Sequence, residues 1–168
     1  MGIFSGLVSV PAFSMTVTTS IPNANYGTLS IGPGNSGIVL PFPAGSGSGQ
    51  YGFLWNASRS VTSGTPDQIT LSGALVNSSG QTGLFVNVGM VAIYCPSGGG
   101  TLTLKPGSSN PVVWSQLPSA GISITAGTVA AWPMDLNVAM AVASGSADQI
   151  DVLASTGTIV YQIGIAGR

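Results

Sequence analysis

Side chains able to perform acid–base, nucleophilic or metal chemistry are rare in this chain. Its 168 residues contain no histidine and no glutamate. Without histidine, a Ser-His-Asp or Cys-His relay cannot be built, and most zinc and iron sites lose a ligand. The sequence therefore predicts a protein that is not an enzyme, with no catalytic residue, cofactor or metal ion. The complete set of charged residues is Arg59, Asp67, Lys105, Asp135, Asp148, Asp151 and Arg168.

The closest approach to a catalytic or metal-binding motif is the pair Asp148 and Asp151. On a strand, residues three apart point to opposite faces, whereas glycoside hydrolysis needs two carboxylates that face each other. A calcium site made of these aspartates and backbone carbonyls is an alternative, but the loop lacks the dense ligand spacing of known calcium motifs. Cys95 is the only cysteine, so no internal disulfide forms, and we interpret it as an inert, buried side chain.

Composition also restricts the partners of the chain. Charged residues make up 4% of the sequence, against about 25% in an average soluble domain. Three basic residues cannot neutralise enough phosphates for nucleic-acid binding. The sequence also has no run of about 18 apolar residues, the length that a membrane-spanning helix needs. The N-terminus has no basic residue ahead of its apolar part, so we predict no secretory signal and synthesis in the cytoplasm. A net charge of −1 gives little electrostatic repulsion between copies and favours a protein that functions as part of an assembly.

The pattern around which the chain is organised is the run from Leu84 to Cys95, in which every even position is apolar. From Val91 onward the odd positions are apolar too, which predicts a central strand covered on both faces. We expect Gly89 to be a bulge or a point of close backbone approach. Thr101 to Lys105 alternates cleanly, and we expect it to form a hairpin with this strand through the glycine-rich turn between them.

Further strands are predicted about every ten residues, separated by Gly, Pro, Ser and Asn. In the last of them, Ile159, Tyr161, Ile163 and Ile165 share one face. This spacing is typical of an all-β protein, and we predict one antiparallel β-sandwich or jelly-roll-like domain over residues 51–168. The expected strands are 52–56, 68–71, 111–114, 122–124, 129–132, 138–142, 150–153 and 158–165.

Residues 1–50 are predicted to form an N-terminal arm or edge strands, ending in a linker. The segment 13–19 alternates, and 28–31 and 38–40 flank a turn at Gly32-Pro33-Gly34-Asn35. The sequence of 44–49, Ala-Gly-Ser-Gly-Ser-Gly, is typical of a flexible linker.

An internal similarity links Asp67-Gln68-Ile69-Thr70-Leu71 to Asp148-Gln149-Ile150-Asp151-Val152-Leu153. The two segments are either a pair of equivalent sites or two strands that each begin with a turn-forming aspartate. The second interpretation is favoured, because Asp is common where a turn leads into a strand.

The aromatic residues offer two interpretations. Trp55, Trp114, Trp132, Tyr26 and Tyr51 could form a platform on which sugar rings stack, as in carbohydrate-binding β-sandwiches. Aromatic residues in alternating strands are more often core or subunit-interface residues. We favour core or interface, and the candidate interface residues are Trp55, Trp114, Trp132, Phe13 and Tyr51.

From Arg59 to Arg168 the chain resembles small β-rich virion proteins of tailed bacteriophages. The run 59–75, which contains Asp67-Gln68-Ile69-Thr70-Leu71-Ser72-Gly73-Ala74-Leu75, is similar to their "R-x-L … D-x-L-D-L-x-G-x-L" segment. Gly80 and 88–94 are similar to the turn and "K-x-I-x-I-x" strand that follow, with Met90 where lysine is common. The run 120–129 is similar to their proline-glycine loop and adjoining strand. The segments 146–150 and 158–167 resemble the "A-D-x-L-x-V" strand and the closing "V-x-Y-D-I-x-I-x-G".

The resemblance covers about two thirds of the chain and excludes residues 1–58. It implies a structural protein of the virion, located on the capsid surface as a head-decoration or cement protein. The implied partners are the major capsid protein and further copies of the chain, with a homotrimer as one arrangement. The alternative is a tail-fibre or other carbohydrate-binding β-sandwich module.

Overall fold

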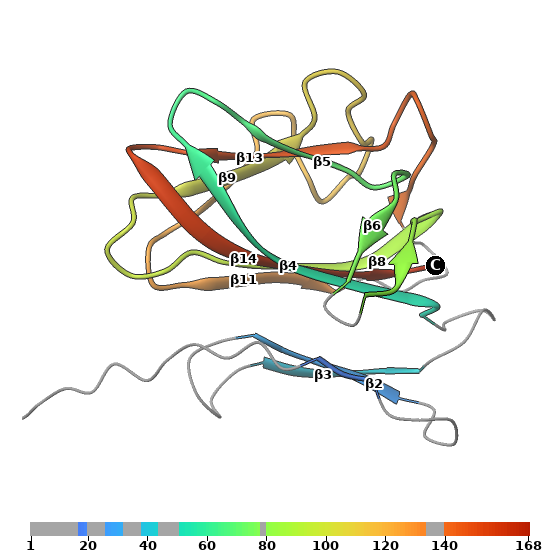
Figure 1. The fold of residues 1–168 in the computed structure, drawn as a ribbon. Coiled ribbons are helices and arrows are strands. Elements are labelled where there is room, and N and C mark those ends of the chain that lie inside the picture. The colour runs from blue at the N-terminus through green and yellow to red at the C-terminus, as the bar shows by residue number, and fades with distance from the viewer. Residues whose placement is uncertain (1–16, 20–25, 32–37, 44–50, 78–79, 134–139) are drawn as a thin grey trace, which may run out of the picture.

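The computed structural model describes residues 17–19, 26–31, 38–43, 51–77, 80–133 and 140–168. Within these ranges the protein is all-β, with antiparallel sheets, as the strand spacing predicts (Figure 1). None of the described residues belongs to a helix that could cross a membrane.

A five-stranded antiparallel sheet contains the predicted central strand. It runs in the order β11 (Val129–Pro133), β8 (Asn87–Tyr94), β14 (Thr158–Gly167) and β4 (Phe53–Thr62), and the short β12 (Met140–Ala141) also pairs with β8. Residues 88–93 of β8 are all buried. The prediction of an inner strand covered on both faces is therefore confirmed.

A second, four-stranded antiparallel sheet has the order β10 (Ile122–Ile124), β9 (Leu102–Pro106), β13 (Gln149–Ala154) and β5 (Asp67–Thr70). A small hairpin, β6 (Leu75–Val76) with β7 (Thr82–Gly83), lies beyond the end of β5. The two similar segments of the sequence are neighbours here, because β5 and β13 pair with Ile69 opposite Ile150.

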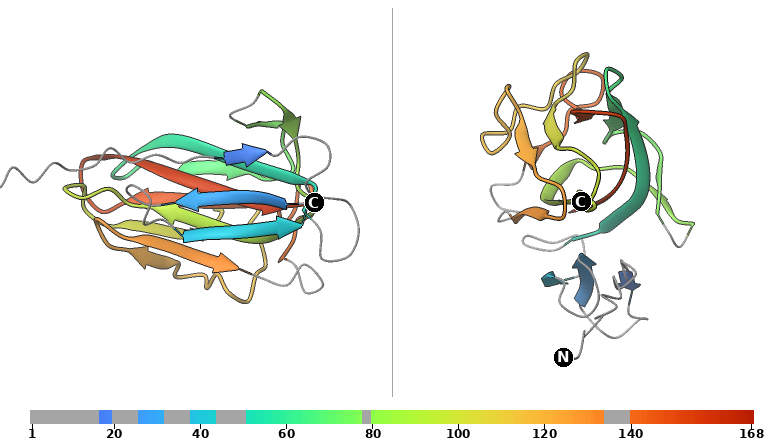
Figure 2. Two further views of the ribbon diagram at one scale, coloured as in Figure 1. Left: turned by 90° about the horizontal axis from the view of Figure 1, so that it is seen from below. Right: turned by 90° about the vertical axis from the view of Figure 1, so that its left-hand side faces the viewer.

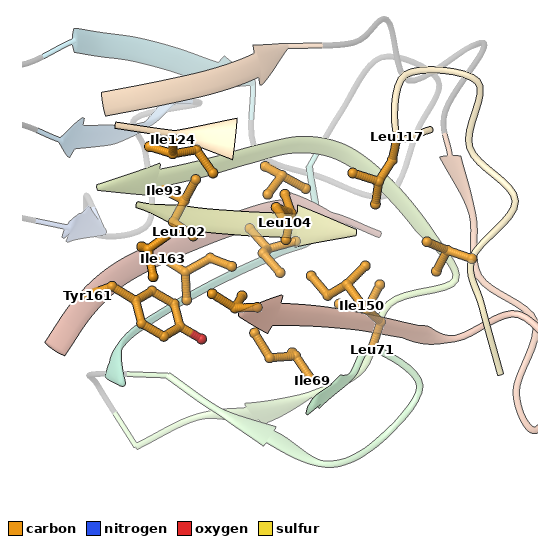
Figure 3. Packing of buried hydrophobic residues seen from close by; sticks show 14 of the residues in the cluster. Ile69, Leu71, Ile93, Leu102, Leu104, Leu117, Ile124, Ile150, Tyr161 and Ile163 are labelled. Atoms are coloured by element: carbon orange, nitrogen blue, oxygen red, sulfur yellow. The ribbon is translucent and has the colours of Figure 1, made fainter. Parts of the chain in front are cut away.

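One hydrophobic core fills the space between the two sheets (Figures 1 and 3). Alternate residues of β14 point into it from one side, and Leu102 and Leu104 of β9 point into it from the other. The predicted shared face of β14 is confirmed, since Ile159, Tyr161, Ile163 and Ile165 are all at most 2% exposed.

The N-terminal segment contributes a separate three-stranded antiparallel sheet in the order β1 (Val17–Thr19), β2 (Tyr26–Ile31) and β3 (Ile38–Pro43). The predicted pair of strands is confirmed, with Ile31 opposite Ile38. This sheet lies along the outer side of the five-stranded sheet, with β2 near β8 (Figures 1 and 2). The predicted turn at 32–35, the linker at 44–49 and residues 13–16 lie outside the described residues.

Gly89 is the predicted irregularity in β8. The pairing with β14 passes from Ala166 opposite Met90 to Gly167 opposite Val88, so Gly89 is the extra residue of a bulge. The backbones also approach closely at this point, because a Cβ atom on Gly167 would collide with the carbonyl oxygen of Asn87. The bulge expected at Gly89 is therefore confirmed, whereas the close backbone approach occurs at the neighbouring Gly167.

The predicted hairpin between β8 and the segment Thr101 to Lys105 is wrong. β9 belongs to the opposite sheet, and the connection from Tyr94 to Leu102 crosses from one sheet to the other. The physical reason is that β11 and β14 already occupy the two hydrogen-bonding edges of β8. The glycine-rich connection includes Gly98, whose φ of 89° lies in the left-handed region that favours glycine.

The strand predicted at 111–114 is also wrong. This stretch is part of a loop in which only Pro111 makes an isolated bridge, to Gln149. Val112 and Trp114 are buried in the core while Val113 is 87% exposed. The apolar pattern therefore reflects a loop whose Val112 and Trp114 side chains close the core, and no ladder continues beyond the bridge at Pro111.

Candidate functional site

The tightest cluster of ionisable groups joins the two sheets. Arg59 of β4 lies opposite Tyr161 of β14, and both reach Asp67 at the start of β5. The Arg59 guanidinium donates from Nε to Asp67 Oδ2 at 2.7 Å and from Nη2 to Oδ1 at 2.5 Å. The Tyr161 hydroxyl donates to the same Oδ2 at 2.6 Å. Such a two-pronged pair fixes the relative position of three strands.

The electrostatics of this cluster favour a stable ion pair at neutral pH. Burial, and then the hydrogen bond to Asp67, raise the pKa of Tyr161 above its ordinary value. Burial alone would raise the pKa of Asp67, but the hydrogen bonds from Arg59 and Tyr161 lower it overall. The bond to Asp67 in turn raises the pKa of Arg59. Every group is pushed away from neutral pH, so the cluster is a structural tie between sheets.

Asp148 and Asp151 also act within the fold. Asp148 is 2% exposed, and its Oδ2 accepts hydrogen bonds from Ser72 Oγ at 2.5 Å and Gly145 N–H at 2.9 Å. These bonds, that of Ser72 first, lower the pKa of Asp148. Asp151 is fully buried and accepts from the backbone N–H of Ser108 at 3.0 Å. Asp67 and Asp148, which head the two similar segments, have different partners, which argues against equivalent sites. Asp67 is the first residue of β5 and Asp148 directly precedes β13, as the favoured interpretation predicts.

Nucleophilic and metal chemistry have no site in the described part of the chain. Cys95 is buried, and burial raises the pKa of its thiol, which makes the reactive thiolate scarcer. No group of three or more His, Cys, Asp or Glu residues is close enough there to hold a metal ion.

The candidate interface aromatics fall into three different environments. Trp55 and Trp114 are core residues, 3% and 6% exposed, and their indole N–H groups donate to the carbonyls of Val76 and Ala141, each at 3.1 Å. Trp132 is half-buried and packs against the core, while Tyr51 is half-buried on the outer side of the five-stranded sheet. Phe13 lies outside the described residues. The four described aromatic residues do not converge into a platform for stacking a sugar ring.

A cavity lined by Trp114 and Trp132 lies between the sheets, at the side where β10 and β11 form their edges. Its volume is about 10 Å³, and its lining is mainly apolar. A space of this size holds at most about one water molecule. It is too small for a sugar. Its other lining residues are Val91, Leu104, Gln116, Leu117, Ile122 and Met140.

The clearest surface feature is a difference between the outer sides of the two sheets. Along β9, β13 and β5 the outward positions include Thr103, Lys105, Gln149 and Gln68. The outer side of the five-stranded sheet instead carries an apolar cluster, which we call the outer apolar face. Its buried members are Met90, Ala92 and Ala166, and its partly buried members are Tyr51, Leu54, Tyr94, Val129 and Ala131.

The outer apolar face is covered in this structure. Met90 and Ala92 are 0% exposed and Ala166 is 1% exposed, although their side chains point away from the core between the sheets. The N-terminal sheet lies on this side, with β2 close to β8 (Figure 2). Burying one side chain the size of Met90 contributes roughly 1.5–3 kcal/mol, so an uncovered face would be a strong site for association.

Two polar groups stand beside this face with unmet hydrogen-bonding capacity. The side-chain oxygens of Asn56 on β4 and Gln162 on β14 are buried and accept no hydrogen bond. Both residues occupy outward positions, alternating with the core residues Trp55 and Tyr161. A surface that adds hydrogen-bond donors at these positions would bind better than a purely apolar one.

The sequence interpretation named Tyr51 as a candidate interface residue but missed the other members of the outer apolar face. A signal was present, because Met90, Ala92 and Tyr94 are the even positions of a strand whose odd positions are also apolar. Leu54 and Ala166 belong to strands far apart in the sequence. Only strand pairing brings them together, because Ala166 lies opposite Leu54 on one side and opposite Met90 on the other.

Comparisons of the chain with protein-family models, with curated proteins and with solved structures find no match. Its function therefore has to be argued from its own residues.

Proposed function

We propose that the chain is a non-enzymatic structural protein of a bacteriophage virion, a head-decoration or cement protein that binds the assembled shell and stabilises it. The observation that carries the proposal is the use of the acidic residues. All three aspartates of the described ranges, Asp67, Asp148 and Asp151, accept hydrogen bonds that hold strands and loops together. These aspartates thus stabilise the fold, and a chain with 4% charged residues has few charges left for its exterior.

The surface chemistry is consistent with life in an assembly. With little charge to keep copies apart, association rests on apolar and hydrogen-bonding contact. Many identical copies that each bury a modest apolar area, at about 25 cal/mol per Å², would add considerable stability to a shell. The partners we propose are the major capsid protein and further copies of this chain, and the resemblance of residues 59–168 to phage virion proteins supports the same assignment.

The finer fold assignment belongs to this proposal as well. We propose that residues 51–168 form a β-sandwich of the jelly-roll-like kind. Support comes from the single core between two antiparallel sheets and from the connection between β8 and β9, which passes from one sheet to the other. Connections of this kind are common in sandwiches and jelly rolls.

A carbohydrate-binding role is favoured by no observation in the described residues. Trp55 and Trp114 are buried with their N–H groups occupied, and the cavity beside Trp132 is too small for a sugar.

The first experiment is to measure the copy number of this chain relative to the major shell protein in purified particles from its source. Decoration predicts comparable numbers, and removal of the chain should then lower the temperature at which the shell opens. A few copies per particle would move the chain to the tail or its fibres, and complete absence from particles would overturn the assignment. In that case a glycan screen read by tryptophan fluorescence tests the alternative.

A further inference from the structure

β11 is an outermost strand of the five-stranded sheet. It pairs with β8 alone, from Val129 opposite Tyr94 to Pro133 opposite Met90. β12 meets the same edge of β8 farther along, opposite Val88 and Asn87, and so continues the line of β11. No strand pairs with the other edge of β11 in the described part of the chain.

The backbone groups on the open edge follow from the hydrogen-bond alternation. The N–H of Cys95 donates to the carbonyl of Thr128 at 3.1 Å, next to the Val129–Tyr94 pair. In an antiparallel ladder, every second residue bonds to the same neighbour, so Ala130 and Trp132 bond to β8. Val129 and Ala131 therefore direct their N–H and C=O groups away from β8, and no described segment hydrogen-bonds to them.

The composition of this edge lacks the usual protection against pairing. Exposed edges are normally blocked by charged residues, prolines or covering segments. β3 has two prolines, β4 has Arg59, and β5 begins with Asp67. The edge of β11 reads Val-Ala-Ala-Trp before Pro133 ends it, without a charge.

We propose that β11 is a self-association edge, which pairs antiparallel with β11 of a second copy across a two-fold axis at Ala130. In this register Val129 of each chain faces Ala131 of the partner subunit. Each such pair exchanges two backbone hydrogen bonds, and Pro133, which has no N–H to donate, stays outside the paired stretch.

The occupant is a second copy because the edge is compatible with itself. Two-fold pairing brings identical residues together, so a charged edge would repel itself, whereas this one carries no charge. Ala130 at the axis is small and leaves the backbones free to approach. The pairing also makes one continuous sheet from two copies and places their outer apolar faces on the same side. The inference rests on the ladder geometry and not on the virion assignment.

The test compares the full chain with Ala131→Pro, which removes the outward N–H while leaving the ladder to β8 intact. Sedimentation equilibrium over a range of concentrations should show dimerisation of the unaltered chain, weakened roughly ten- to hundredfold by Ala131→Pro, as expected for two lost hydrogen bonds. Val76→Lys is the matched control, because Val76 is 57% exposed and lies beside Trp55 of β4, at the opposite edge of the sheet from β11, so dimerisation should be unchanged.

A second measurement needs no substitution and covers the case in which Ala131→Pro does not fold. Amide hydrogen exchange followed by NMR should show protection of Val129 and Ala131 that increases with protein concentration, while Ala130 stays protected throughout. Fast exchange of Val129 and Ala131 at every concentration, or a monomeric unaltered chain, would overturn the inference. Neither result would touch the copy-number test of the proposed function.

Discussion

The two sheets share one core but differ on their outer sides. The four-stranded sheet presents mainly polar residues outward, and its one fully buried outward group, Asp151, is held by the backbone of Ser108. The five-stranded sheet presents Met90, Ala92 and Ala166, which are buried under a further layer of the molecule.

This difference shows how a chain with few charges can have one outer side that is stable in water and another that must be covered. A polar outer side can remain in water, because Ser, Thr and Gln side chains hydrogen-bond to solvent. An apolar outer side is stable only when another layer covers it, whether that layer belongs to the same chain or to a partner. We therefore propose that association takes place at the five-stranded sheet, whose edge at β11 is unpaired in the described part of the chain.

The largest expected effect comes from placing a charge under the covering layer. Ala92→Asp puts an unpaired carboxylate at a fully buried position, and we expect it to lower the free energy of unfolding by about 3–5 kcal/mol. Thr103→Asp, at a half-buried outward position of β9, is the matched control and should change it by about 0.5 kcal/mol or less. Urea unfolding measures both, and equal losses would mean that the two outer sides do not differ.

A smaller effect is expected from the buried carboxylate on the polar side. Asp151→Ala leaves the Ser108 N–H without its acceptor, and we expect a loss of about 1–3 kcal/mol. Asp151→Asn keeps an oxygen that can accept this bond and should lose clearly less. If the two variants unfold at the same urea concentration, the hydrogen bond to the loop contributes nothing measurable.

The pH dependence should also come from the polar groups that tie the sheets and loops. The pKa values of Asp67 and Asp148 are lowered in the folded protein from an unfolded value near 3.8. Their stabilisation is therefore fully present above that value and is lost as pH falls through the folded pKa values. Urea midpoints should be flat from neutral pH to about pH 5 and should decrease at lower pH.

Asp148→Asn is the variant that checks this assignment. Asparagine cannot ionise, so the variant should be less stable at neutral pH and should lose less on acidification than the unaltered chain. An unchanged acid dependence would show that other groups cause it.

The smallest change in the free energy of unfolding is expected at an exposed position on the outer side of the five-stranded sheet. Val160 of β14 occupies an outward position and is 59% exposed, so Val160→Thr should change the free energy of unfolding by less than about 0.5 kcal/mol. Met90→Thr, on the same side but fully buried, should lose several times more. Similar small losses at both positions would place Met90 at an uncovered surface.

Much of the strand pattern could be predicted from the sequence, because alternation and turn residues are local signals. The bulge at Gly89 is predictable because a single glycine inside an apolar strand often marks an irregular point of the ladder. The two wrong predictions share a cause, because both features depend on tertiary packing. The apolar stretch that follows Pro111 has the pattern of a strand but forms a loop that closes the core. The glycine-rich segment after β8 has the composition of a hairpin turn but connects one sheet to the other.

The candidate site was less predictable than the fold. Large aromatic residues drew attention to Trp55 and Trp114, which pack in the core, whereas the outer apolar face is built mainly of smaller or flexible side chains. Alanine and methionine give little signal in a sequence. They form a surface only when three or four strands place them side by side.

The amino-acid sequence by itself determined that histidine and glutamate side chains are missing, and it determined the all-β class, because these depend on residue types and on period-two spacing. Only the tertiary structure decided which strands share a sheet, that Asp67 meets Arg59 and Tyr161 between the sheets, and which outer side is apolar. These outcomes depend on pairing between residues far apart in the chain, such as Tyr161 with Arg59, and no local pattern records which partner a strand will choose.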